Sequence, residues 1–160
     1  MVTEKNSNRQ IRLLLVDKEA ESLGFILEGL AERCQRKIEV SGSTCQDNGL
    51  EIIADKKPEL VFAGVTGNGV GTATKKQMPW ARYSIGDYVR LIKERSPGSK
   101  LVAFTGGVYT RLDALRDGAD GYLFKTSMTY RIDDRLLFDV LIESVLEGKY
   151  WEISEKFPID

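Results

Sequence analysis

Residues 11–17 read Ile-Arg-Leu-Leu-Leu-Val-Asp, a short apolar run that ends in a carboxylate. A run of this length with one polar interruption predicts a β-strand that is buried on both faces. Apolar side chains then recur at helical spacing from Leu23 to Cys34, so we expect an amphipathic helix over residues 19–34. A buried strand that leads into a helix is the building unit of parallel α/β sheets.

The same unit repeats along the chain. Four more strands are expected, at residues 37–41, 60–65, 101–105 and 121–125. Four more helices are expected, over residues 46–56, from about Tyr88 to Arg95, and over residues 109–117 and 134–148. Parallel strands need right-handed crossovers, which place helices on both faces of the sheet. The predicted fold class is therefore a doubly wound α/β sheet.

The faces of the last two helices can be assigned from spacing. In the fourth helix the sequence predicts that Leu112 and Leu115 face inward, with Gly118 just past its end. In the fifth helix the inward set is predicted to be Leu137, Val140, Leu141 and Val145.

We expect a single domain with short extensions. Residues 1–10 form a polar leader without the apolar segment of a signal peptide, residues 11–148 the domain, and residues 149–160 a tail. Residues 66–84 interrupt the rhythm as a Gly- and Thr-rich insertion between the third strand and the third helix. Because no apolar run approaches the roughly 20 residues that span a bilayer, we predict a cytoplasmic protein that does not bind membranes.

Composition excludes several kinds of chemistry. The 160 residues include 23 basic and 24 acidic side chains, a net charge of −1, so no direct binding to nucleic acid is expected. There is no histidine, which excludes histidine metal sites and Ser–His catalysis. The cysteines, Cys34 and Cys45, have no metal-binding spacing, and two reduced, half-buried thiols are favoured over a disulfide between them.

Four motifs together resemble the response-regulator receiver family, of the CheY-like superfamily. They are Leu-Leu-Val-Asp ending at Asp17, Pro-Glu-Leu-Val-Phe-Ala-Gly ending at Gly64, Leu-Val-Ala-Phe-Thr-Gly around Thr105, and Gly-Ala-Asp-Gly-Tyr-Leu-Phe-Lys ending at Lys125. The end of the last helix is similar to receivers that precede LuxR-type DNA-binding domains. The resemblance implies a flavodoxin-like (βα)5 sheet of order 2-1-3-4-5, with a site at the carboxyl ends of its strands.

In that family, the resemblance implies, an acidic pair after the first strand and an acceptor aspartate after the third bind Mg²⁺. The divalent cation neutralises the carboxylates and the incoming phosphoryl group. A threonine hydroxyl and a lysine ammonium then hold the phosphoryl oxygens. Asp17, Thr105 and Lys125 match three of these positions.

Three positions depart from the family pattern. Gly64 stands where the acceptor aspartate belongs, Lys18 replaces the second acid, and Thr126 replaces a common cis-proline. Like charges a few ångströms apart repel by about 4 kcal/mol at an effective dielectric near 20, so Lys18 opposes a cation there. We expect weak or absent Mg²⁺ binding, no cofactor, and a degenerate "pseudo-receiver" with a vestigial pocket of Asp17, Lys18, Gly64, Thr105 and Lys125.

Several side chains allow two interpretations. Lys18 either joins an ion pair with Asp17 and Lys125 or points to water. Lys125 is expected to keep a structural bond to Asp17, because a buried ammonium needs an anion. Tyr122 is either part of the Thr105-linked switch and contact surface of the family or an exposed strand aromatic.

The insertion and the tail carry further candidates. The glycines of residues 67–71 fit neither the P-loop nor the dinucleotide fingerprint. A mobile insertion over the pocket is the favoured interpretation, and Lys75, Lys76 and Trp80 are candidates for a docking element within it. In the tail, Tyr150, Trp151 and Phe157 either pack back onto the domain or form a partner site.

The residues favour a binding module over an enzyme, because no nucleophile–base pair is visible. We expect a receiver-like module of two-component or phosphorelay signalling that acts independently of phosphorylation. It would contact other signalling proteins, or a second copy, through its fourth helix, fifth strand and fifth helix, a face that includes Tyr122. The alternatives are a sensor of a small anionic metabolite, with Lys18 and Lys125 facing the anion, and an atypically phosphorylated response regulator.

Overall fold

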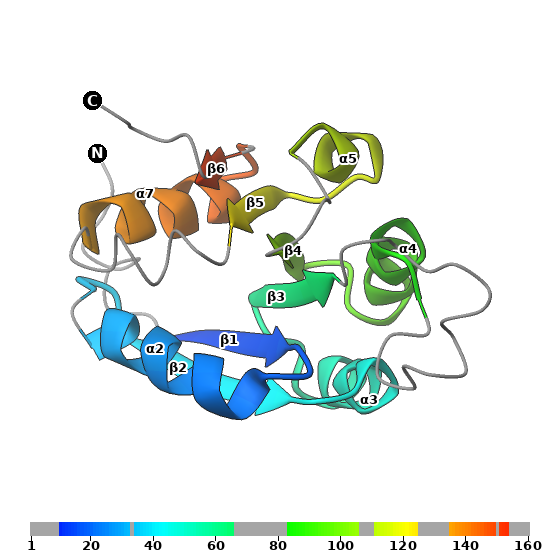
Figure 1. Cartoon of the computed structure of the whole chain (residues 1–160), viewed down its shortest axis with the longest axis horizontal. Helices are drawn as coiled ribbons and strands as arrows, with labels where there is room; N and C mark the ends of the chain where they lie inside the picture. The colour runs from blue at the N-terminus through cyan, green and yellow to red at the C-terminus, as the bar shows by residue number, and fades with distance from the viewer. Residues whose placement is uncertain are drawn as a thin grey trace.

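Parallel strands form the centre of the molecule (Figure 1). The computed structural model describes residues 10–32, 34–65, 83–105, 111–124, 135–149 and 151–153. Within these residues the strands pair in the order β2-β1-β3-β4-β5-β6, and every pair is parallel. They are β1 (Ile11–Val16), β2 (Ile38–Ser43), β3 (Leu60–Val65), β4 (Lys100–Thr105), β5 (Gly121–Phe124) and β6 (Trp151–Ile153). The predicted order 2-1-3-4-5 is confirmed for the first five strands.

Two layers of helices cover the sheet. One face carries α2 (Ala20–Glu32) and α7 (Arg135–Leu146), and the other carries α3 (Gln46–Lys56), α4 (Ile85–Arg95) and α5 (Arg111–Arg116) (Figure 1). This doubly wound arrangement confirms the predicted fold class. None of the helices in the described part of the chain combines the length and the apolar character that a membrane span requires.

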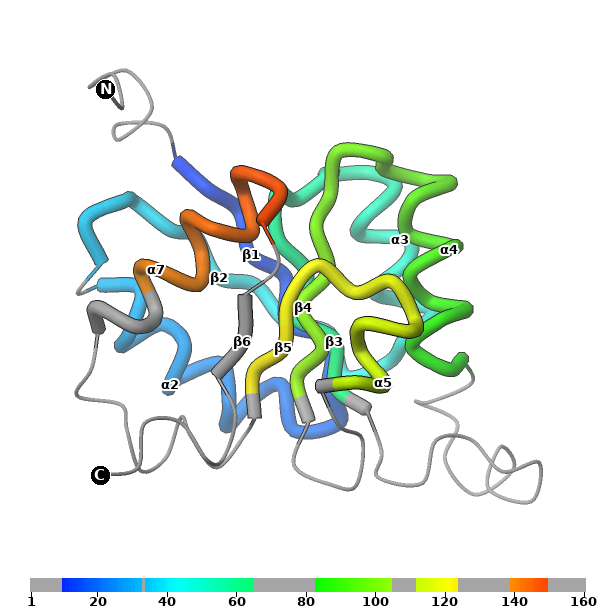
Figure 2. Tube along the Cα trace, turned by 90° about the horizontal axis from the view of Figure 1, so that it is seen from above, coloured from blue at the N-terminus to red at the C-terminus, as the bar shows by residue number. Residues whose placement is uncertain are grey.

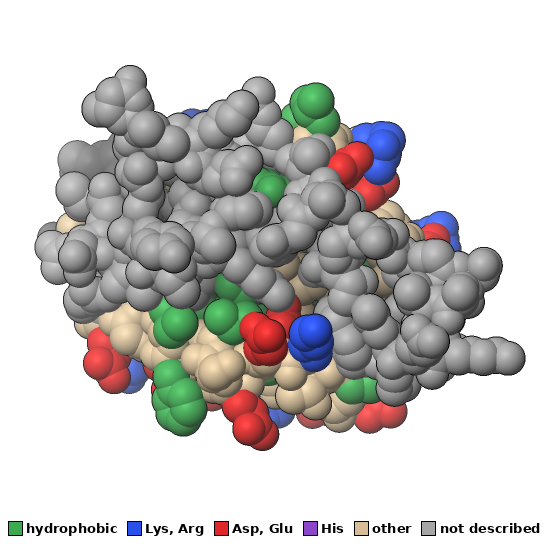
Figure 3. Space-filling model, in the orientation of Figure 1, with side chains coloured by type: hydrophobic (Ala, Val, Ile, Leu, Met, Phe, Trp, Pro, Cys, Tyr) green, Lys and Arg blue, Asp and Glu red, His purple; other side chains and the backbone are tan. Residues whose placement is uncertain are grey.

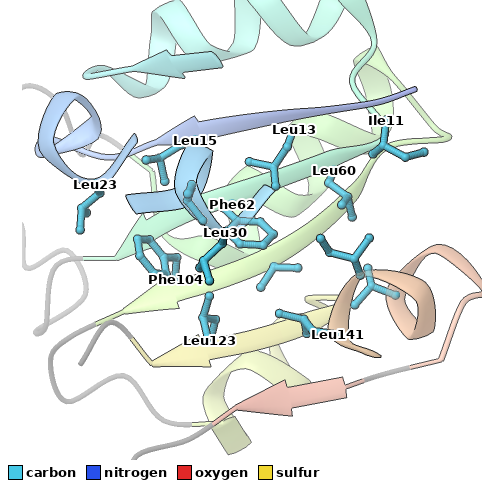
Figure 4. Close-up of a cluster of buried hydrophobic side chains, with 14 of the residues drawn as sticks. Ile11, Leu13, Leu15, Leu23, Leu30, Leu60, Phe62, Phe104, Leu123 and Leu141 are labelled. Atoms are coloured by element: carbon cyan, nitrogen blue, oxygen red, sulfur yellow. The ribbon is translucent and has the colours of Figure 1, made fainter. Parts of the chain in front are cut away.

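One hydrophobic core lies between the sheet and the pair α2 and α7 (Figure 4). Leu13 and Leu15 of β1, Phe62 of β3 and Phe104 of β4 contribute to it, and Leu141 of α7 packs against them. The ring centroids of Phe62 and Phe104 are 6.2 Å apart. Each fully buried side chain of this size contributes roughly 1.5–3 kcal/mol, so this core holds the central strands and the two helices in fixed positions.

The second core uses the alternate residues of the same strands. Leu14, Val61 and Ala103 face α3, α4 and α5 and are fully buried. Because successive side chains of a strand point to opposite faces, both sets become buried when helices cover both sides. This double burial explains why the strands read as continuous apolar runs.

The predicted inward face of α5 was wrong. Leu112 and Leu115 are 66% and 49% exposed, whereas Ala114 is fully buried against the sheet. Successive helical residues are about 100° apart, so Leu112 lies on the side of the helix away from Ala114. Val140 of α7, also predicted to face inward, is 44% exposed, whereas Leu141 and Val145 are buried as predicted. The side chain of Leu137, the fourth residue of that set, lies outside the described residues.

A short strand extends the sheet beyond the predicted five. β6 pairs with β5 in parallel, with Tyr122 opposite Glu152, and it comes from residues assigned to the tail. Gly148, at φ +84°, lies in the turn between α7 and β6. The left-handed conformation favours glycine there, as it does at Gly118 after α5. The outer edge of β5 is therefore covered by the chain's own β6.

Candidate functional site

The carboxyl ends of the central strands meet at one edge of the sheet (Figure 2). Val16 is opposite Ala63, and Val65 is opposite Thr105, which is in turn opposite Phe124. This register brings the backbones of Asp17, Gly64 and Thr105 to the same edge, where a ligand site is expected in a doubly wound sheet. Lys125 and Thr126, and the side chain of Thr105, lie outside the described residues.

Asp17 is completely buried at this edge, and its backbone N–H donates to the carbonyl of Ser43 at 3.0 Å. Its Oδ1 accepts a hydrogen bond from the backbone N–H of Glu19 at 2.8 Å, and its carbonyl accepts one from Ala20 at 3.0 Å. These bonds resemble an N-cap, in which a carboxylate satisfies the free N–H groups at the start of a helix. Asp17 therefore has a structural role at the start of α2, whatever else it contacts.

Gly64 leaves room for the carboxylate of Asp17. A Cβ atom at position 64 would lie 1.9 Å from Oδ2 and 2.7 Å from Cγ of Asp17. Real Cβ atoms do not approach other heavy atoms so closely, so any other residue at position 64 would require Asp17 to move. The space in which an acceptor side chain would begin is filled by another carboxylate.

Lys18, beside Asp17 in the sequence, is exposed to solvent, as is Glu19. Exposure favours the interpretation in which the Lys18 ammonium points to water. Within the described ranges there is no group of three His, Cys, Asp or Glu residues that could hold a metal ion.

One of the two interpretations made Tyr122 an exposed strand aromatic, and the structure corrects this one. Its side chain is only 4% exposed and belongs to the core beneath α5, together with Ala103, Ala114 and Ala119. It is buried because the helix above it presents alanine, which leaves space for a large ring. In this conformation Tyr122 offers little area to a partner.

Sequence reasoning missed a polar anchor near this edge. Gln46, at the start of α3, is 3% exposed. Its Oε1 accepts from the backbone N–H of Tyr83 at 2.7 Å, and its Nε2 donates to the carbonyl of Tyr83 at 3.0 Å. The two bonds fix the chain where it returns from residues 66–82 and enters α4. A single glutamine carries no pattern that would have revealed this role.

Two tyrosine rings complete the anchor. Tyr88 donates its hydroxyl to the backbone carbonyl of Gln46 at 2.9 Å, and Tyr83 donates its own to Asp47 Oδ1 at 3.0 Å. The rings stack with centroids 6.1 Å apart. Burial raises the pKa of Tyr88 far above its ordinary value, so its hydroxyl remains a donor at any physiological pH.

Other predictions fall partly or wholly outside the described residues. Residues 67–71, Lys75, Lys76 and Trp80 are among these, as are Tyr150, Phe157 and the side chain of Trp151. Cys34 and Cys45 are half-buried and form no disulfide, as expected.

Comparison with protein-family models and with curated proteins finds no match. Comparison with solved structures finds the same fold in response regulators. A LuxR-family two-component response regulator from Aurantimonas sp. SI85-9A1 is 19% identical, with a TM-score of 0.63 over 92% of this chain and 91% of that chain. A LuxR-family DNA-binding response regulator from Silicibacter pomeroyi is 19% identical, with a TM-score of 0.62 over 92% and 99%.

The response regulator domain of CheB from Thermotoga maritima is 18% identical, with a TM-score of 0.60 over 88% of this chain and 96% of that chain. At these identities the similarity shows the fold alone. The chain therefore has the fold of receiver domains.

Proposed function

We propose that this chain is a receiver-like signalling module that acts through protein–protein contacts and without phosphorylation. Two kinds of observation support the proposal. The fold is that of receiver domains of two-component signalling. The edge of the sheet where such a domain would carry its acceptor has a glycine in that position and a buried carboxylate pressed against it.

The contact between Asp17 and Gly64 carries the proposal. An acyl phosphate needs a carboxylate nucleophile at the end of β3, and Gly64 has no side chain. The space beside it holds Asp17 Oδ2, 1.9 Å from where a Cβ would stand. Asp17 is also occupied in holding the start of α2. Because Gly64 supplies no carboxylate and the exposed Lys18 follows Asp17, we propose that Mg²⁺ binds weakly or not at all.

The arrangement supports the anion-sensor alternative less well. A buried carboxylate at the strand ends repels an incoming anion, and Lys18 is exposed rather than directed at an enclosed space. We therefore keep the sensor, and phosphorylation at an unusual position, as outcomes that the experiment below would detect.

The contact surface that we propose surrounds the β5 edge of the sheet. α5 and α7 lie on either side of this edge, and β6 lies along it. Leu112, Leu115 and Val140 expose apolar area here. Leu112 and Leu115 belong to α5 and Val140 to α7, so each of the two helices offers exposed apolar area to a partner. The proposed partner is another signalling protein or a second copy of this chain.

Incubation with acetyl phosphate and Mg²⁺, followed by intact-protein mass spectrometry, tests the central claim. We expect no mass increase of one phosphoryl group, while an active receiver domain treated in parallel becomes modified. NMR titration with beryllofluoride and Mg²⁺ provides a second measurement, in which we expect no shifts at residues 17 and 64. Mg²⁺-dependent phosphorylation at any residue would refute the proposal, and shifts with metabolite anions alone would favour the sensor.

A further inference from the structure

A groove lies between α2 and the edge strand β2, away from the β5 edge. Its volume is about 510 Å³, and its lining comes from the first two-thirds of α2 and from the chain between Val40 and Asn48. Figure 3 shows this side of the molecule, where hydrophobic and acidic side chains lie next to one another over α2 and β2. No step of the proposed function uses this groove.

One stripe of α2 forms the helical wall. Glu21, Gly24, Phe25 and Glu28 follow the i, i+3, i+4, i+7 spacing that places residues on a single helix face. Phe25 is 75% exposed, an unusual position for a phenylalanine. A Cβ at Gly24 would meet no atom within 4 Å, so this glycine leaves open space beside the phenylalanine.

The opposite wall is a strand with an unpaired edge. Within the described strands β2 pairs only with β1. The carbonyl of Lys37 accepts a hydrogen bond from the N–H of Ile11 at 2.8 Å, and that of Ser43 accepts one from Asp17, just after β1, at 3.0 Å. Because inward and outward backbone groups alternate along an edge strand, the N–H and C=O groups of Val40 and Gly42 point away from β1. They can pair with an added strand.

The charge of the groove indicates what kind of strand would bind there. Its lining includes the carboxylates of Glu21 and Glu28 and no Lys or Arg. The two are about 10 Å apart along α2, since each residue rises about 1.5 Å. Alternate side chains of an extended peptide are about 7 Å apart. Lysine and arginine side chains are long and flexible enough to make up the difference and to reach both carboxylates.

We propose that this groove binds an extended, basic segment of a partner protein, which adds to the outer edge of β2. Backbone hydrogen bonds to Val40 and Gly42 would supply affinity, as in other cases of strand addition. An apolar side chain would pack on Phe25 beside Gly24, and basic side chains would pair with Glu21 and Glu28. The inference rests on the proposed signalling function only for the class of partner.

The test uses the full chain and a fluorescein-labelled peptide in which lysine alternates with valine. We expect saturable binding by fluorescence polarisation, weakened by salt, and amide shifts confined to residues 21–28 and 40–44. A peptide with glutamate in place of lysine should not bind. The double variant Glu21→Gln/Glu28→Gln should bind roughly fivefold more weakly, the size expected for two exposed ion pairs.

A glycine pair on α2 provides a matched control. Gly24→Met places a side chain in the groove and should abolish most of the binding, whereas Gly29→Met should bind like the wild type. Both positions have open space around an added Cβ, and only Gly24 lines the groove.

Four results would overturn the proposal: equal binding of the acidic peptide, equal loss in both methionine variants, shifts elsewhere, or no binding at millimolar peptide. A dimer that forms through this groove in sedimentation would also overturn it, since the occupant would be a second copy. None of these results changes the expected phosphorylation outcome, so failure of the two proposals can be distinguished.

Discussion

Gly64 is the residue whose replacement has the clearest expected effect. A methyl group at this position would clash with the buried carboxylate of Asp17, at 1.9 Å from Oδ2. Asp17 cannot move freely because it accepts the N–H of Glu19. We therefore expect Gly64→Ala to lower the free energy of unfolding by about 2 kcal/mol, in the range of other overpacked sites. Urea denaturation followed by circular dichroism measures this.

A double-mutant cycle isolates the clash. In an Asp17→Ala background the carboxylate is absent, so Gly64→Ala should cost less than it does in the wild type. Gly98→Ala serves as a control, because a Cβ there meets no atom within 4 Å. Equal costs of Gly64→Ala in the two backgrounds would show that Asp17 is not the obstacle.

The ion pair between Arg12 and Glu59 predicts a dependence of stability on pH. Burial alone would raise the pKa of Glu59, but hydrogen bonds from Arg12 outweigh burial and lower it. They come from the Arg12 backbone N–H at 2.8 Å and from its guanidinium at 3.2 Å. Because the pKa of Glu59 is lower in the folded state, the ion pair stabilises the fold when the pH is above the pKa of an unfolded glutamate, near 4.3. It is lost as the pH falls through the folded value.

Glu59→Gln should remove this contribution to the pH dependence of the unfolding free energy. The difference between the unfolding free energies at pH 7 and pH 3 should shrink by less than about 1 kcal/mol. The effect is small because Arg12 is 45% exposed, and solvent screens ion pairs at exposed positions. Thermal unfolding across this pH range measures it. A larger difference in the variant than in the wild type would contradict the assigned direction of the pKa.

Between elements, the contact of α3 with α4 depends on a buried hydroxyl. Tyr88→Phe removes the donor to the carbonyl of Gln46 and should cost about 1 kcal/mol. Tyr83→Phe is the matched control: its hydroxyl bonds to Asp47 at a half-buried position and should cost less. Chemical denaturation of both variants compares them. A greater loss in Tyr83→Phe would place the important contact at Asp47 instead.

Most elements could be predicted because burial leaves a periodic signal. The structure gives β1, β3 and α3 the predicted limits. For the two strands the reason is double burial, which makes each central strand a continuous apolar run. The inward face of α5 could not be predicted. Leucine outside and alanine inside reverse the usual pattern, and Ala114 shares this core with the large ring of Tyr122.

The site could be predicted in part. The missing side chain at position 64 is visible in the sequence. The orientation of the Asp17 carboxylate is not, because it depends on a hydrogen bond from the backbone N–H of Glu19 that no spacing reveals. β6 has three residues, too few for a periodic signal. Its pairing with β5 depends on how α7 returns the chain to the sheet.

For the molecule as a whole, the two edges of the sheet differ. The described sheet ends on one side in the three-residue β6, which lies along β5, and on the other in the six-residue β2. A module that binds partners through both sides would present apolar helix surface at the first and free backbone groups at the second. The two surfaces are separated by the width of the sheet, so substitutions at one should leave the other unchanged.

Self-association provides a test of that separation. If a second copy binds at the β5 edge, Leu112→Gln/Leu115→Gln should weaken the dimer about tenfold or more, because both side chains lose apolar contact area there. Glutamine is a good helix former, so α5 should persist. Phe25→Gln, on the other helical layer, is the matched control and should leave the dimer unchanged. Sedimentation equilibrium of the three proteins measures this. A dimer weakened by Phe25→Gln and not by the α5 variant would assign self-association to the groove beside β2. A wild-type chain that stays monomeric would leave another protein as the partner of α5.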